Sequence, residues 1–132
     1  MFSAGFNDAN SIIQVVLADL SEVHVRLLTA QINQHPGMRV TASVQTVVAL
    51  LRAVNRTTDV LILGAQEVHP PPRILGHLFT EYASLRVLVM SLHNNMMGAY
   101  WLHVKHNPLV IEEAESVTNH ILWLHQLDPM AD

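Results

Sequence analysis

The sequence contains no cysteine and few charged residues, and each scarcity excludes a class of chemistry. Without cysteine the chain has no disulfide, no thiolate metal ligand and no cysteine nucleophile. Charged residues make up 14% of the 132 positions, and the formal net charge is −4 with no run of lysine or arginine. The chain therefore lacks the electrostatic footprint of a nucleic-acid-binding domain. Half of the residues are apolar, which favours a compact globule over a disordered chain.

Long hydrophobic segments are missing as well. The longest apolar runs, such as 60–63 and 87–90, are far too short to cross a bilayer. The first ten residues have neither the basic nor the apolar part of a signal peptide. We therefore expect a soluble cytoplasmic protein without a membrane partner. We expect a flexible segment at 1–11, one domain at 12–128, and a tail or linker to an output domain at 129–132.

Two kinds of segment alternate along the chain. Runs rich in β-branched residues predict strands at 12–18, 38–44, 59–63, 85–90 and 108–111. Apolar residues at helical spacing, with Ser21 as a plausible first N-cap, predict helices at 21–35, 45–55, 73–83, 94–105 and 113–127. Five strand–helix units in alternation indicate an α/β fold, in which helices cover both faces of a parallel sheet.

In such a sheet, ligands bind beyond the carboxyl ends of the strands. We expect these ends at Asp19 and Leu20, at Gly64, at Ser91 and at Glu112. No glycine follows the first strand, so neither a dinucleotide-binding fingerprint nor a P-loop is present. No nucleophile–base pair and no carboxylate pair can be assembled from these positions. We therefore expect neither enzymatic activity nor a bound cofactor.

Three runs resemble strands of the receiver domains of bacterial response regulators. The first, third and fourth strands of that family are similar to residues 15–19, 59–63 and 85–91, most closely in the branch with LuxR/NarL-type helix-turn-helix output. The spacing agrees with the family, since Gly64 lies 45 positions after Asp19 and Ser91 lies 27 positions after Gly64. The resemblance implies a flavodoxin-like (βα)5 sandwich of three layers, with a five-stranded parallel sheet in the order 2-1-3-4-5.

A working receiver accepts a phosphoryl group on an aspartate after its third strand. The resemblance implies that Asp19 corresponds to one member of the acidic pair that holds magnesium, and that Ser91 corresponds to the hydroxyl that contacts the phosphoryl group. Leu20 stands at the second acid, Gly64 at the phosphoacceptor and Glu112 at the lysine. The five positions thus form a degenerate phosphorylation site.

These departures have chemical consequences. Gly64 has no side chain to phosphorylate, and a single carboxylate at Asp19 is a poor magnesium site. Glu112 would place negative charge where an incoming phosphate needs positive charge. Asp59 cannot substitute for the missing acceptor, because it lies five positions back, roughly 16 Å away along an extended strand.

The last third of the chain holds candidate interface residues. Met97, Trp101 and Trp123 are either ordinary core residues or anchors for a partner protein. The proline run at 70–72 stiffens the loop after Gly64 and favours a fixed conformation there. The nine histidines show no clustering with carboxylates, so we expect no metal site.

Two hypotheses of function follow from this sequence. The first is a phosphorylation-independent, receiver-like signalling domain that acts by homodimerisation or by contact with another regulator. It would be the regulatory part of a transcription factor whose DNA-binding domain is absent from this chain. The alternative is a domain that senses a small molecule in the less polar pocket left by Gly64 and Leu20.

Overall fold

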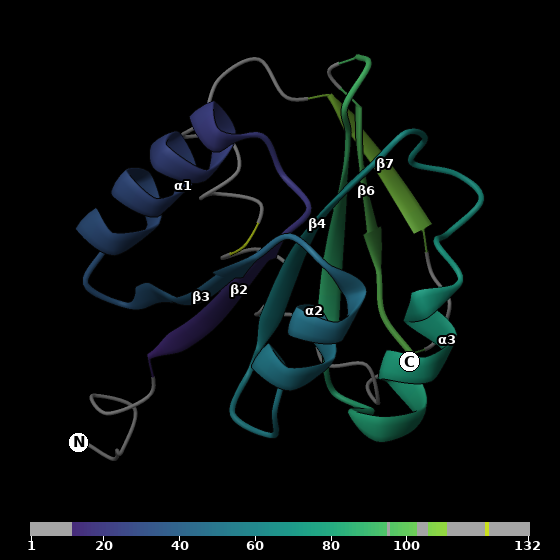
Figure 1. Ribbon diagram of the computed structural model, residues 1–132, viewed down its shortest axis with the longest axis horizontal. Coiled ribbons are helices and arrows are strands. Elements are labelled where there is room, and N and C mark those ends of the chain that lie inside the picture. The colour runs from purple at the N-terminus through teal and green to yellow at the C-terminus, as the bar shows by residue number, and fades with distance from the viewer. Residues whose placement is uncertain (1–11, 95, 103–105, 111–120, 122–132) are drawn as a thin grey trace.

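The computed structural model describes residues 12–94, 96–102, 106–110 and 121, which form an α/β fold around one sheet. The six strands of the sheet lie in the order β3-β2-β4-β5-β6-β7, which runs from left to right in Figure 1. Along the chain the elements are β2 (Ile13–Ala18), α1 (Glu22–Gln34), β3 (Met38–Val44), α2 (Val47–Ala53), β4 (Val60–Ala65), α3 (Ile74–Glu81), β5 (Arg86–Ser91), β6 (Met96–Tyr100) and β7 (His106–Val110).

Helices cover both faces of the sheet and give three layers. On one face, α1 buries Leu28 and Ile32 against side chains of β2, β4, β5 and β6. On the other face, α2 and α3 pack against the same strands through Leu50 and Leu78. The central strands are buried on both sides, which is why their sequences are nearly continuous apolar runs. No helix of the described residues has the length and apolarity that crossing a membrane requires.

The first four strands confirm the predicted arrangement. Numbered along the chain, the first four strands lie side by side in the order 2-1-3-4. All three pairings among them are parallel. The predicted cap of the first helix is also confirmed, because the Ser21 hydroxyl accepts a hydrogen bond from the His24 amide at 3.2 Å. These four strands and the first three helices begin and end within two residues of their predicted bounds.

The edge of the sheet at β3 is partly covered by the preceding helix. The side-chain oxygen of Asn33, in the last turn of α1, accepts a hydrogen bond from the backbone amide of Val40 at 2.8 Å. The pairing of β3 with β2 also shifts by one residue between Val15 and Val16, so that Thr41 has no partner in the register. This irregularity makes β3 a less regular edge than an ideal strand.

The helix predicted at 94–105 is wrong, because the structure has strand β6 there. Met97, Ala99 and Trp101 alternate with residues that face the other side, and all three join the core on the α1 face. Their spacing of two is that of a strand, whereas the prediction followed the wider spacing of Met97 and Trp101. A polar turn also favours the hairpin, since the side-chain oxygen of Asn94 accepts a hydrogen bond from the Met96 amide at 2.9 Å.

The all-parallel sheet is therefore also wrong. The fifth strand along the chain, β6, does lie fifth in the sheet, but it is antiparallel to β5. The strand predicted at 108–111 corresponds to β7, which lies sixth because β6 was not predicted as a strand. β7 is antiparallel to β6 and so runs in the direction of β5, from which β6 separates it. Pro108, which lacks an amide hydrogen, lies in β7 at the edge of the sheet, where a proline is tolerated.

Several predicted segments fall outside the described residues. These are the amino-terminal segment 1–11, the tail 129–132, and the helix 113–127 except for Ile121. Ile121 is helical and fully buried in the core on the α1 face. Among the described residues, that face of the sheet is therefore covered by α1 and by Ile121.

Candidate functional site

The turn after β2 holds Asp19 and Leu20 in opposite environments. Asp19 has a φ of 55°, a left-handed conformation that aspartate adopts more readily than most residues. Its side chain is exposed, whereas Leu20 is 3% exposed and belongs to the core on the α1 face. The Asp19 amide donates to the Val44 carbonyl at 2.9 Å, and the Gln45 amide group donates to the Leu20 carbonyl at 3.0 Å. The turn is thus fixed from both sides.

Gly64 lies in direct contact with this turn. A Cβ atom at position 64 would stand 2.2 Å from the Asp19 carbonyl oxygen and 3.1 Å from a terminal methyl carbon of Leu20. A backbone carbonyl cannot swing away as the end of a side chain can, so any side chain here requires the turn to move. The space that a side chain at position 64 would need is therefore filled by the backbone of Asp19 and the side chain of Leu20.

Ser91, at the end of β5, is 8% exposed and connects two loops. Its hydroxyl donates to the carbonyl of Gln66 at 3.2 Å and accepts hydrogen bonds from the amides of His93 and Asn94, at 3.1 and 3.3 Å. The side chains of His93 and Gln66 are also in hydrogen-bond contact. Ser91 thus serves as a loop-bonding hydroxyl between the β4–α3 loop and the β5–β6 turn, the structural role that such a residue commonly has.

The loop after β4 is held by a buried tyrosine. The Tyr100 hydroxyl, on β6, donates to the Val68 carbonyl at 2.5 Å, and both residues are buried. Burial raises the pKa of Tyr100 above its ordinary value near 10, because the phenolate would lose solvation. Further along, the Leu75 amide donates to the Pro72 carbonyl at 3.0 Å, so the proline run leads directly into α3.

Of the remaining predicted site residues, those that the structure describes do not join the turn at Asp19 and Leu20. Met97 and Trp101 are 0% and 5% exposed and pack in the core on the α1 face, so they offer no exposed anchor for a partner. Glu112 and Trp123 lie outside the described residues. Asp59 lies at the opposite end of β4, where its carboxylate accepts a hydrogen bond from the Gln14 amide at 2.8 Å.

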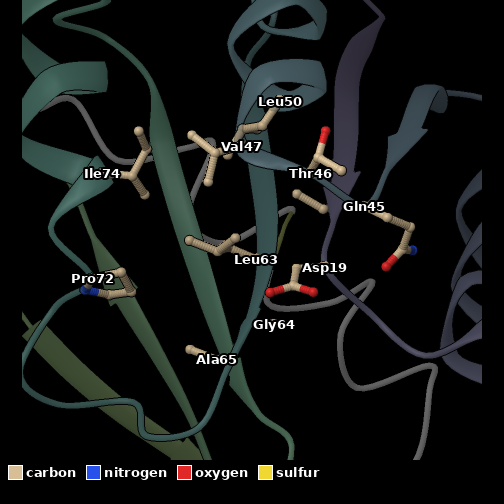
Figure 2. Close-up of a pocket in the computed structure, with 11 residues that line it drawn as sticks. Asp19, Gln45, Thr46, Val47, Leu50, Leu63, Gly64, Ala65, Pro72 and Ile74 are labelled. Carbon is tan, nitrogen blue, oxygen red and sulfur yellow. The ribbon is translucent and has the colours of Figure 1, made fainter.

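Beside the turn, a pocket of about 260 Å³ opens between α2 and α3 (Figure 2). The ends of β2 and β4 form its floor, and the segment that leads into α2 and the first residue of α3 form its walls. Most of the lining is apolar, with Val47, Leu50, Leu63 and Ile74 among the contributors. Its polar side chains belong to Asp19, Gln45 and Thr46.

Sequence reasoning placed Asp19 and Gly64 here but missed the residues of α2. Thr46 accepts a hydrogen bond from the Ala49 amide at 3.1 Å and is the N-cap of α2, which the prediction began at Gln45. A threonine directly before an apolar run is the usual signal for a cap, and would have placed the start correctly. No such signal marks the pairing of Tyr100 with Val68, because it depends on the unexpected strand β6.

Exposed apolar side chains lie on α2, which borders the pocket, and also on α1, which covers the other face of the sheet. Val47, Val48 and Leu51 of α2 are 58%, 60% and 38% exposed, and Val23 and Leu27 of α1 are exposed by at least half. Within the part of the chain that the structure describes, no three histidine, aspartate or glutamate residues lie close enough to hold a metal ion.

Comparisons with known proteins give little beyond this geometry. No protein-family model and no curated protein matches the sequence. One solved structure that the comparison matches is a heterocyclase in complex with substrate and cofactor, with 16% sequence identity and a TM-score of 0.44. The alignment covers 80% of this chain but 13% of the heterocyclase chain, and likeness at this level says nothing about activity.

Proposed function

We propose that this chain is a receiver-like signalling domain that works without phosphorylation, through contact with a second copy of itself or with another regulatory protein. It would be the regulatory part of a transcription factor, in which a separate domain contacts DNA. The proposal rests on the resemblance of its strands to receiver domains and on the order of the first four strands in the sheet.

The contact between Gly64 and the turn at Asp19 is the observation that carries this proposal. The position of the acceptor has no side chain, and a backbone carbonyl occupies the place of its Cβ substituents. The second acid is replaced by the buried Leu20, which helps to fill the same space. A phosphoryl group would have neither an attachment point nor the room to be bound.

Exposure to phosphodonors tests the proposal directly. We expect that acetyl phosphate or beryllofluoride, each with magnesium, produces no mass increase, no change in the amide spectrum and no change in oligomeric state. A receiver domain with an intact aspartate provides the positive control. A stable acyl phosphate on this chain, together with a change in its oligomeric state, would contradict the proposal.

Contact with a partner is tested by sedimentation equilibrium over a range of concentrations. We expect self-association, or association with a regulator encoded nearby, that is the same with and without phosphodonor. The exposed apolar residues of α1 and α2 are compatible with such contacts. A chain that remains monomeric and binds no regulator would argue against a contact function.

A second candidate function is the sensing of a small molecule, and the pocket between α2 and α3 favours it. The pocket lies at the carboxyl ends of β2 and β4, where open α/β sheets bind ligands. A ligand that binds the native state raises the melting temperature, so a thermal-shift screen of metabolites tests this function. The absence of any shift across a chemically diverse panel would count against it.

A further inference from the structure

The size of the pocket limits what it can hold. Its volume of about 260 Å³ exceeds the roughly 150 Å³ of an engineered cavity that binds benzene, and falls just below the roughly 300–1,000 Å³ of typical ligand pockets. A single ring or a branched alkyl group with one short substituent is therefore of suitable size. The apolar side chains of Leu50, Leu63 and Ile74 would contact such a group.

The polar side chains that line the pocket differ in whether they already make hydrogen bonds within the protein. Thr46 caps α2 through the Ala49 amide, and the Gln45 side chain donates to the Leu20 carbonyl. The Asp19 carboxylate makes no hydrogen bond or ion pair with the described part of the chain. In Figure 2 it lies within the ring of lining side chains. No lysine, arginine or histidine is among the lining residues, so the charge that the pocket offers a ligand is negative.

The backbone that carries this carboxylate is fixed before any ligand arrives. The backbone of Asp19 is fixed by the hydrogen bond that its amide donates to the Val44 carbonyl, and the next residue, Leu20, is buried in the core. A ligand that pairs with a group already held in position loses less free energy to ordering. The arrangement is therefore suited to binding and not only to solvation of an exposed acid.

We infer that the pocket between α2 and α3 binds a small organic cation, whose apolar part fills the pocket while its ammonium group pairs with Asp19. This inference rests on the second candidate function, the sensing of a small molecule. An anion would be repelled by Asp19, and a metal ion would find too few free oxygen ligands. An uncharged ligand would leave the carboxylate without a partner.

The test compares three probes of similar shape that differ in charge: benzylamine, benzyl alcohol and benzoate. Each is titrated into the complete 132-residue chain while amide chemical shifts are recorded by NMR at neutral pH and low salt. We expect benzylamine to shift the amides of residues that line the pocket, Val47 and Ala65 among them. Benzyl alcohol should bind about tenfold more weakly, as expected for the loss of a hydrogen-bonded charge, and benzoate should not bind. Added salt should weaken the binding of benzylamine alone.

Two variants test whether the charge of Asp19, and not a change in the fold, determines benzylamine affinity. Asp19→Asn keeps the size of the side chain and tolerates the left-handed backbone, and it should reduce benzylamine affinity about tenfold, to that of benzyl alcohol. Glu81→Gln removes an exposed carboxylate at the end of α3, which does not line the pocket, and should leave the affinity unchanged. Native amide dispersion in both variants shows that each is folded.

The outcomes distinguish failure of the inferred cation preference from failure of the candidate function, the sensing of a small molecule. Equal binding of benzylamine and benzyl alcohol, or equal binding by Asp19→Asn, would overturn the preference for a cation while leaving a pocket that senses small molecules. Binding of none of the three probes would overturn both. Shifts confined to amides outside the pocket would also overturn the inference, because the cation would then be bound elsewhere.

Discussion

Gly64 shows how one missing side chain changes its surroundings as well as its own chemistry. Because position 64 has no Cβ, the Asp19 carbonyl can approach β4 closely, and Leu20 can turn into the core. The left-handed backbone of Asp19 allows both arrangements at once, with the carboxylate outside and the leucine inside. An aspartate introduced at position 64 would therefore require the turn to move, because its Cβ would overlap the Asp19 carbonyl oxygen.

Substitution of Gly64 tests this contact. We expect Gly64→Ala to lower the free energy of unfolding by about 1–3 kcal/mol, because the new methyl group overlaps the Asp19 carbonyl oxygen. Gly76→Ala is the matched control, since nothing lies within 4 Å of a Cβ there and alanine favours α3 by about 0.5–1 kcal/mol. Urea denaturation measures both changes. Equal stability of Gly64→Ala and the wild type would show that the contact is not tight.

Tyr100 gives a second prediction, which depends on pH. Loss of its hydroxyl in Tyr100→Phe removes the hydrogen bond to Val68 and should cost about 1 kcal/mol at neutral pH. Burial raises the pKa of Tyr100 in the folded chain, so its contribution is fully present below pH 10, the ordinary value. The contribution is lost as the pH rises further, through the folded pKa. Denaturation at pH 8 and above pH 10 should therefore show a smaller difference between the two proteins at the higher pH.

At the scale of elements, α2 is short and depends on its cap. The helix has seven residues, of which Leu50 is the one fully buried, and its first turn contains no acidic residue. Helices of this length have little intrinsic stability, so tertiary packing and capping must hold them. Since Thr46 and Val47 line the pocket, the start of α2 also sets the shape of the pocket.

Removal of the cap should loosen α2. We expect Thr46→Ala to lower the free energy of unfolding by about 1 kcal/mol and to speed hydrogen exchange at the Ala49 amide, which loses its acceptor. Thr46→Ser, which keeps the hydroxyl, should restore both properties. The outcome contrary to this expectation is an Ala49 amide that exchanges at the wild-type rate in Thr46→Ala.

Elements also show what the sequence could and could not reveal. The strands β2, β4 and β5 were predictable because burial on both faces requires continuous apolar runs, and the cap at Ser21 is a local signal. At 94–105, Met97 and Trp101 fit both helical and alternating spacing, and local propensity did not distinguish them. The pairing of β6 with β5 in a hairpin decided the outcome, and the local signal for it, the polar turn at Asn94, was not used in the prediction.

For the candidate site, the sequence revealed the missing groups but not how the space was filled. The absence of an acceptor at Gly64 follows from its identity alone. The close approach of Asp19 and the orientation of the pocket depend on backbone angles and on packing between segments far apart in the chain. Such features follow from tertiary structure and not from local sequence.

At the scale of the whole molecule, the candidate site lies at one edge of the sheet. The carboxyl ends of β2, β4 and β5 still meet there, and Asp19, Gly64 and Ser91 lie on neighbouring strand ends. At these ends lie the turn at Asp19, its close backbone contact with Gly64, and the Ser91 hydroxyl, which is hydrogen-bonded to a loop. The apolar pocket lies beside them. If the chain is the receiver-like domain that we propose, its described strand ends keep the location of the receiver site without its phosphoacceptor.

This arrangement predicts indifference to magnesium. Asp19 is the single carboxylate among the described residues that line the pocket at the strand ends. We therefore expect the melting temperature to be the same in magnesium chloride and in EDTA, because an ion that does not bind the native state cannot stabilise it. Calcium provides a second divalent control. A rise in melting temperature with magnesium alone, lost in Asp19→Asn, would show that a cation site persists.

The cover of β3 by Asn33 bears on how copies of this chain behave when crowded. A strand at the margin of a sheet is a template onto which a neighbouring molecule can add its own strand, and successive additions lead to fibres. The amide of Val40 already donates a hydrogen bond to the Asn33 side chain. The register shift at Thr41 interrupts the regular backbone hydrogen bonding that an added strand from another molecule would need. One asparagine at the end of a helix thereby helps to keep the chain dispersed.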